Sequence, residues 1–246
     1  QAYKEMLPPG GPVKTQVVGF ATPQTDLQAA RVQEFMNYQI TQVMKEYDPE
    51  TDQLLFYLPL SGSAFRKVHF DQALDRPVSR FIPSEKLIVN YGARITHVID
   101  MSMNDVRKLQ QSGFYRKTPL SEGADDSDEY TGDIQEEIDE LQGIKPSGGN
   151  SDECEVLEMH VDLDIPGYED LDADGEETGI KLPYIVTILP RQSTILSIRR
   201  NYDPMDSRRD RIDHFVHYKF LPGVGFYGFG LTHMIGGLSR GATSIL

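Results

Sequence analysis

Two residue types that often mark how a protein is stabilised are nearly absent, since the 246 residues include one cysteine, Cys154, and no tryptophan. A single cysteine excludes an internal disulfide. The fold must therefore be held by packing and hydrogen bonds, and a reducing or redox-indifferent setting is expected. Length and a 39% hydrophobic content are sufficient for one large core or two small ones.

Charged side chains are missing from one long stretch, Phe220 to Ser239, although a quarter of all residues are charged. This stretch contains six glycines and ten large apolar residues. Its length approaches that of a membrane span, but the glycines, Pro222, Thr232 and His233 oppose insertion. We therefore expect no membrane contact and predict that the stretch is buried in protein.

The same region predicts three consecutive structures. Residues His214 to Phe220 alternate as in a strand, Gly223 to Gly230 form a glycine-aromatic elbow, and Phe229 to Leu246 have helical spacing. The helix has no stop signal and the chain begins at Gln1, so we interpret the sequence as a piece of a longer protein.

Acidic residues are concentrated in one segment. Residues 122–177 carry 22 of the 38 acidic residues and one basic residue, so their net charge is −21, whereas the remainder is +7. This composition is typical of a solvated insert and argues against a domain that grips nucleic acid. We predict a mobile insert over residues 121–150, with one short helix at residues 133–141.

The fold class predicted from the pattern is α+β. We expect a helical hairpin, a mixed sheet with links at Pro77 and Pro83, a small antiparallel β-meander or barrel, and the start of a long helix. The expected parts are residues 1–120, 121–150, 151–222 and 223–246. The expected helices are Leu27 to Tyr47, capped by Thr25 or Asp26, then Gln53 to Leu60, and a helix from the Ser102 cap to Gln111 that stops at Gly113. The expected strands are Ala64 to Phe70, Leu87 to Tyr91, Arg94 to Met101, Cys154 to Ile165, Leu182 to Leu189, Thr194 to Tyr202 and Ile212 to Phe220.

Two glycine motifs match enzyme signatures. Gly223, Gly225 and Gly228 have the spacing of the dinucleotide fingerprint, but Phe226 and Tyr227 crowd the turn and the preceding strand belongs to a meander. The second motif places Ser239 between glycines as in a hydrolase elbow, yet within a helical run. We interpret both matches as accidental and expect no cofactor and no catalytic residue.

Three groups of polar residues, one acidic, one of arginines and one of histidines, indicate a binding site less clearly than the glycine motifs. Asp170, Asp172, Asp174 and Gly175 open like a calcium loop, but Lys181 stands where a bidentate Glu is required. A solvated acidic turn is the better interpretation, and no metal is expected. The arginines are interleaved with aspartates, which favours a self-paired link over a phosphate track; they are Arg199, Arg200, Arg208, Arg209 and Arg211. The histidines lack metal-ligand spacing; they are His69, His97, His160, His214, His217 and His233.

Four blocks remain distinctive: LLFYLPLSGSAFRKVHFD, RITHVIDMSMNDVRKLQQSGFY, TGIKLPYIVTILPRQSTILSIRRNYDP and HYKFLPGVGFYGFGLTHMIGGLSRGATSIL. Together they resemble the portal protein, or head-to-tail connector, of tailed double-stranded-DNA bacteriophages. The resemblance runs from about Arg31 to Leu246 apart from the acidic insert, and the last block is the most specific.

The resemblance implies a structural, non-enzymatic subunit of the virion, assembled in the bacterial cytoplasm. It implies a ring, normally of twelve subunits, at a capsid vertex, with the terminase motor, capsid or scaffold and tail adaptors as partners. DNA would pass through the channel without sequence-specific binding. This chain matches the outer wing and the start of the stem helix, without the clip or the tunnel loop. The alternatives are a glycine-motif hydrolase or nucleotide-dependent enzyme, and a calcium-responsive acidic binding module.

Overall fold

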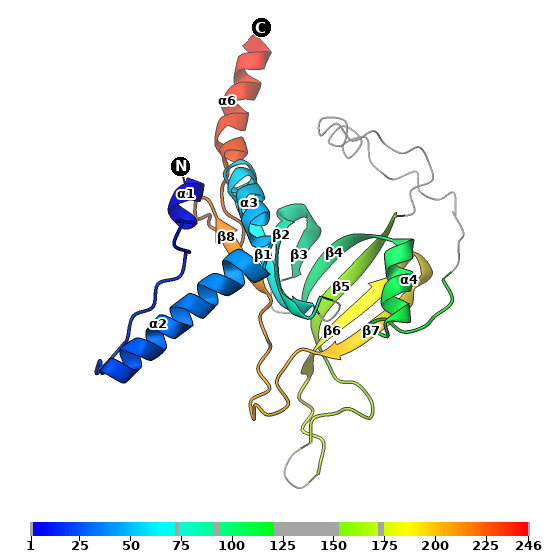
Figure 1. The fold of residues 1–246 in the computed structure, drawn as a ribbon. Coiled ribbons are helices and arrows are strands. Elements are labelled where there is room, and N and C mark those ends of the chain that lie inside the picture. Colours follow the sequence, from blue (N-terminus) through cyan, green and yellow to red (C-terminus); the bar gives the residue numbers. More distant parts are fainter. Residues whose placement is uncertain (1, 72–73, 91–93, 121–152, 172–174, 246) are drawn as a thin grey trace. The chain divides into compact units, whose positions relative to one another are not determined.

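The computed structural model describes the chain except residues 1, 72–73, 91–93, 121–152, 172–174 and 246 (Figure 1). It divides the protein into two compact units. Unit 1 combines Gln1–Leu87 with Asp213–Leu246, and unit 2 is Ile88–Ile212. Both contain helices and antiparallel strands, so the predicted α+β class is confirmed. The helix predicted at residues 133–141 lies outside the described residues.

Unit 1 is built on a three-stranded antiparallel sheet in the order β2-β1-β8. Its strands are β1 (Ser63–Asp71), β2 (Arg76–Pro83) and β8 (Phe215–Lys219). Its helices are α1 (Ala2–Met6), α2 (Pro23–Tyr38), which continues as the π-helical turn η1 (Gln39–Val43), α3 (Tyr47–Ser61), the short 3-10 turn η2 (Ser84–Lys86) and α6 (Leu231–Ile245).

Helix α2 begins earlier than predicted because Thr22, and neither Thr25 nor Asp26, is its N-cap. The Thr22 hydroxyl accepts a hydrogen bond from the Thr25 amide, and the Thr25 hydroxyl accepts one from the Thr22 amide. This reciprocal capping box satisfies two amides that have no partner within the helix. Pro23 then occupies the first turn, where a missing N–H costs little.

The predicted helical hairpin is wrong in its packing. Helix α3 packs on β1 and β2 and buries Leu54, whereas α2 contributes no buried residue. Helix α3 begins at Tyr47, earlier than the predicted Gln53, and Pro49 lies in its first turn, a position that a proline tolerates. Gly62 ends α3 in the left-handed conformation, with φ of 82°.

Strand β2 was not predicted, because Pro77 and Pro83 were interpreted as links. Both prolines belong to the strand, where Pro77 is opposite Phe70 and Pro83 is opposite Ala64. The strand lies at the edge of its sheet, and a proline is accommodated there because outward-facing amides need no partner strand.

Unit 2 contains a five-stranded sheet in the order β3-β4-β5-β6-β7, with β4 to β7 paired antiparallel. The strands are β3 (Leu87–Asn90), β4 (Arg94–Ser102), β5 (Glu153–Leu163), β6 (Leu182–Leu189) and β7 (Thr194–Arg200), with the short 3-10 turn η3 (Pro190–Gln192) between β6 and β7. Helix α4 (Met103–Gln111) is capped by Ser102, as predicted. Its Val106 enters a core with Val156, Leu189 and Leu196.

The predicted meander is therefore correct for β5, β6 and β7 and is extended by β4. It is wrong for the last strand, because β8 leaves this sheet and pairs with β1 in unit 1. The register joins Ser63 to Lys219 and Phe65 to His217. The elbow that follows β8 is consequently positioned by residues about 150 positions earlier in the chain.

Candidate functional site

The glycine-aromatic elbow crosses the end of α3 at three glycines of unit 1. A Cβ atom at Gly62, Gly228 or Gly230 would lie within 3.0 Å of backbone atoms of the facing segment. Glycine is the residue that permits two backbones to approach so closely. We call the crossing of residues 60–65 with residues 217–232 the glycine junction.

Hydrogen bonds fix the glycine junction on both sides. The Phe220 amide donates to the Gly62 carbonyl at 3.0 Å, and the Gly228 amide donates to the Ser63 hydroxyl oxygen at 2.8 Å. Thr232, in the first turn of α6, donates from its hydroxyl to the Leu60 carbonyl. The start of α6 is thereby attached to the end of α3.

Three rings stack beside the glycines. The His217 ring centroid lies 4.4 Å from that of Phe65 and 4.6 Å from that of Phe226. Burial lowers the pKa of the His217 imidazole from its ordinary value, and the neighbouring Lys219 ammonium lowers it further. The neutral imidazole favoured here has its Nε2 atom 3.2 Å from the Ser63 oxygen. Gly228 and Gly230 are buried, but Val224, Tyr227 and Phe229 are exposed, so the predicted burial of the elbow is wrong for most of its large side chains within this chain.

The dinucleotide fingerprint does not have the required context in this structure. Strand β8 belongs to an antiparallel sheet, not to a parallel strand-helix-strand unit. The amide of Gly228, which would face a pyrophosphate, is hydrogen bonded to Ser63. A side chain at Gly223 would collide with the Tyr227 carbonyl. Gly223 and Gly228 therefore serve backbone packing, whereas a Cβ at Gly225 would meet no atom within 4 Å.

Ser239 lies in the middle of α6, and its carbonyl accepts a hydrogen bond from the Thr243 hydroxyl within the same helix. A hydrolase elbow instead places its serine on a sharp turn between a strand and a helix. The sequence match therefore lacks the geometry of that motif.

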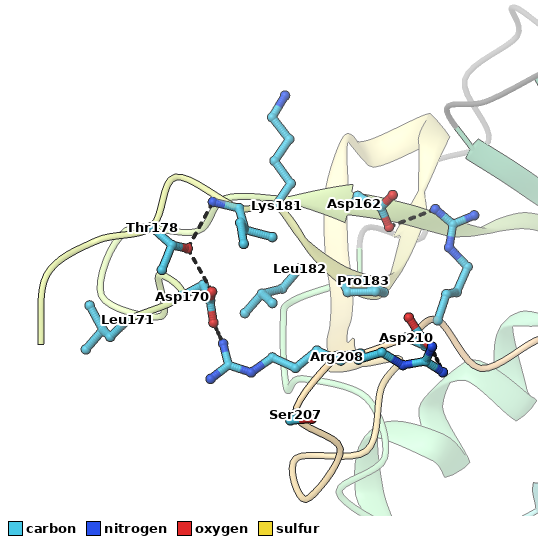
Figure 2. A pocket seen from close by; sticks show the side chains of 13 residues that line it. Asp162, Asp170, Leu171, Thr178, Lys181, Leu182, Pro183, Ser207, Arg208 and Asp210 are labelled. Carbon is cyan, nitrogen blue, oxygen red and sulfur yellow. Dashed lines mark hydrogen bonds and ion pairs between the residues drawn. The ribbon is translucent and has the colours of Figure 1, made fainter. Parts of the chain in front are cut away.

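The acidic loop of unit 2 borders a cavity of about 400 Å³, shown in Figure 2. Asp170 is 8% exposed, accepts a hydrogen bond from the Thr178 hydroxyl at 2.7 Å, and forms an ion pair with Arg209. Lys181 extends away from Asp170 in this view. Asp172 and Asp174 lie outside the described residues. Within the described part of the chain, no group of three or more His, Cys, Asp or Glu is arranged to hold a metal.

The arginines around this cavity are paired with carboxylates. Arg208 pairs with the interleaved Asp210 at 2.7 Å. Arg209 and Arg211 instead pair with Asp170 and Asp162, which come from more distant segments. The sequence predicted the self-pairing but not these partners. Because these charges are compensated within unit 2, the loops form a cross-linked surface and not a row of free cations.

Another histidine, His160, lies in a cluster of charged and aromatic side chains in unit 2. His160 is 2% exposed in β5, with its Nε2 atom 2.9 Å from the Glu158 carboxylate. Arg199 also approaches Glu158, at 3.7 Å, and covers the Phe114 ring. Burial raises the pKa of the adjacent Tyr115 hydroxyl to about 12, and the Glu158 charge adds to this effect. This cluster has the character of a paired core network.

One surface of unit 1 does not follow from the sequence, which predicts a helix over Leu27 to Tyr47 and a helical hairpin but not an exposed helix face. Residues 13–15 lie along α2, because the Val13 amide and carbonyl bond to the Asn37 side chain and Thr15 bonds to Gln33 and Ala29. We call residues 13–38 the arm. Its large apolar side chains are 43% to 99% exposed; they are Val18, Phe20, Leu27, Val32, Phe35, Met36 and Tyr38.

A second group of exposed apolar side chains belongs to α3 and α6, two helices that contact each other. It contains Phe56 and Leu60, one turn apart on α3, with exposed fractions of 77% and 46%, and Met234 and Ile235 on α6. We call these four residues the α3–α6 patch. The sequence offered one signal for these exposed side chains: residues 53–60 carry no charge and are apolar on more than one face, a pattern typical of a helix that is covered on more than one side.

Within the described residues, none of the helices combines the length and apolar content that a bilayer crossing requires. Comparison with known proteins adds no identification: no family model matches the sequence, and a search of curated proteins finds no match.

Proposed function

We propose that this chain is a structural, non-catalytic subunit of a phage portal ring, part of the conduit at a capsid vertex through which DNA is packaged and ejected. The main support is the sequence block 217–246, which carries the most specific resemblance and forms the glycine junction and α6. A close crossing of two backbones is suited to hold a helix at a fixed angle to a sheet within each subunit of a ring.

Exposed apolar side chains also favour an assembled state. Monomeric proteins rarely present large contiguous apolar patches, and such patches mark interaction surfaces. Unit 1 carries two groups of exposed apolar side chains, the arm and the α3–α6 patch. In the proposed ring, neighbouring subunits cover these surfaces, and the motor, capsid or scaffold and tail adaptor bind the assembled particle in the virion.

The charge distribution is compatible with a conduit for sliding DNA. The net charge of −14, most of it from residues 122–177, disfavours the counterion-release binding that would hold DNA in place. Contact with DNA would then be independent of sequence and weak.

Electron microscopy of the full-length protein tests the proposal. Rings with a central channel are the expected result. Discrete monomers under all salt and concentration conditions would contradict it, and would return attention to the enzyme and calcium-module alternatives.

A further inference from the structure

The arm and the α3–α6 patch are two different apolar surfaces of one unit, and each lacks a cover within the described part of the chain. We propose that they bind each other between copies: the arm of one chain docks on the α3–α6 patch of the next. This inference rests on the proposed ring and names the contact that joins its subunits.

The arm has the properties of a preformed binding element. Helix α2 is capped by the Thr22–Thr25 box, and five hydrogen bonds join residues 13–15 to it, so its shape is set before association. A preorganised element loses less conformational entropy on binding than a flexible one. Helix α2 buries none of its own residues, yet hydrogen bonds at its cap and along its length stabilise its shape. Binding to another molecule would explain why this exposed helix is preorganised.

The exposed area on the arm approaches that of a stable interface. At roughly 200 Å² for an aromatic side chain, Phe20, Phe35 and Tyr38 together offer about 400 Å² at their exposed fractions of 99%, 62% and 55%. One partner in a standard interface contributes about 800 Å². The four aliphatic side chains of the arm bring it toward that value.

Charge favours a second copy of the same chain as the occupant. The arm carries Lys14, Arg31, Asp26 and Glu34, so its net charge is zero, and residues 53–61 and 220–239 carry no charged side chain. Charge repulsion therefore does not oppose contact between these two surfaces of identical chains. Interfaces also exclude charged residues from their centres.

The geometry of the contact determines the assembly. A contact between two different surfaces is heterologous, so each bound copy still presents one free arm and one free patch. Such contacts propagate head to tail and close into a ring when the rotation between copies permits it. A contact between two arms would instead stop at a dimer.

The test uses two double variants and one single variant of the chain. F20S/F35S removes the aromatic side chains of the arm, F56S/M234S removes part of the patch, and F70S is a matched control because Phe70 is a 59% exposed aromatic residue of β1 outside both surfaces. Far-ultraviolet circular dichroism checks that each variant folds. Sedimentation velocity over a concentration series then measures self-association.

We expect F20S/F35S and F56S/M234S each to raise the dissociation constant of self-association by about tenfold or more for every large side chain removed. F70S should leave that constant unchanged. Mixing the arm variant with the patch variant should restore one intact contact and give heterodimers, with no larger species. Unchanged association of either variant, no heterodimer in the mixture, or a chain that stays monomeric at all concentrations would overturn the inference. Rings formed by F20S/F35S would overturn it while leaving the proposed portal function in place.

Discussion

Helices α4 and α2 begin in the same way but differ in what covers them. Each has a hydroxyl N-cap, Ser102 or Thr22, whose side chain accepts a backbone hydrogen bond, and each has apolar residues at helical spacing. Val106 of α4 is fully buried against the sheet of unit 2, whereas α2 has no buried residue. An amphipathic pattern therefore predicts that one helix face needs a cover, but not whether the same chain provides it.

The largest expected difference between the two helices comes from a buried charge. V106D would place a carboxylate without a partner in the core of unit 2, which should cost more than about 3 kcal/mol of the free energy of unfolding. V32D on α2 should change that free energy by less than about 0.5 kcal/mol. Urea titrations followed by tyrosine fluorescence measure both. Equal losses would show that the α2 stripe belongs to an intrachain core.

The glycines that end α3 and α4 provide a second matched pair. Gly62 and Gly113 both have φ of 82°, but a Cβ would collide with backbone at Gly62 and meets nothing within 4 Å at Gly113. G113A should cost about 1 kcal/mol for the left-handed backbone alone, whereas G62A should cost about 3 kcal/mol or more. Thermal unfolding of the two variants measures the difference. A G62A variant as stable as G113A would contradict the close backbone crossing.

Removing the N-cap of α4 or of α2 should have a smaller effect on stability than the substitutions above. S102A should lower the free energy of unfolding of unit 2 by about 1 kcal/mol, because the Asp105 amide loses its acceptor in a helix that contributes to the core. T22A should loosen α2 by a similar amount locally without changing the urea midpoint. Amide hydrogen exchange over residues 23–30 detects the local effect. A shifted midpoint in T22A would mean that α2 unfolds together with the rest of unit 1.

The smallest effect is the pH dependence at the glycine junction. Because the folded state lowers the pKa of His217, the unfolded chain binds a proton more readily. The contribution of His217 to stability should be complete above its ordinary pKa of about 6.5 and decrease as the pH falls below it. Urea midpoints between about pH 8 and pH 5 should fall less in H217Q than in the unaltered chain. Identical pH profiles would place the imidazole in water.

The sequence alone determined the features whose causes are local. The Ser102 cap, the inward Val106 and the stop at Gly113 follow from neighbouring residues, and so does the need to bury an uncharged glycine-rich elbow. Hydrogen bonds between residues three or four apart and the spacing of apolar side chains decide these features. The predicted burial of the elbow is met only where it contacts Gly62, Ser63 and Phe65, because Val224, Tyr227 and Phe229 are exposed in this chain.

Tertiary structure decided which distant segments meet. Strand β8 could continue the meander or pair with β1 according to its alternation, and β2 was hidden by two prolines that an edge strand tolerates. The predicted hairpin paired the first two long helices, yet α3 packs on β1, β2 and α6. Which partner a strand or helix takes depends on how much apolar surface each possible pairing buries. That comparison involves the whole fold, so the residue spacing within one segment does not predict it.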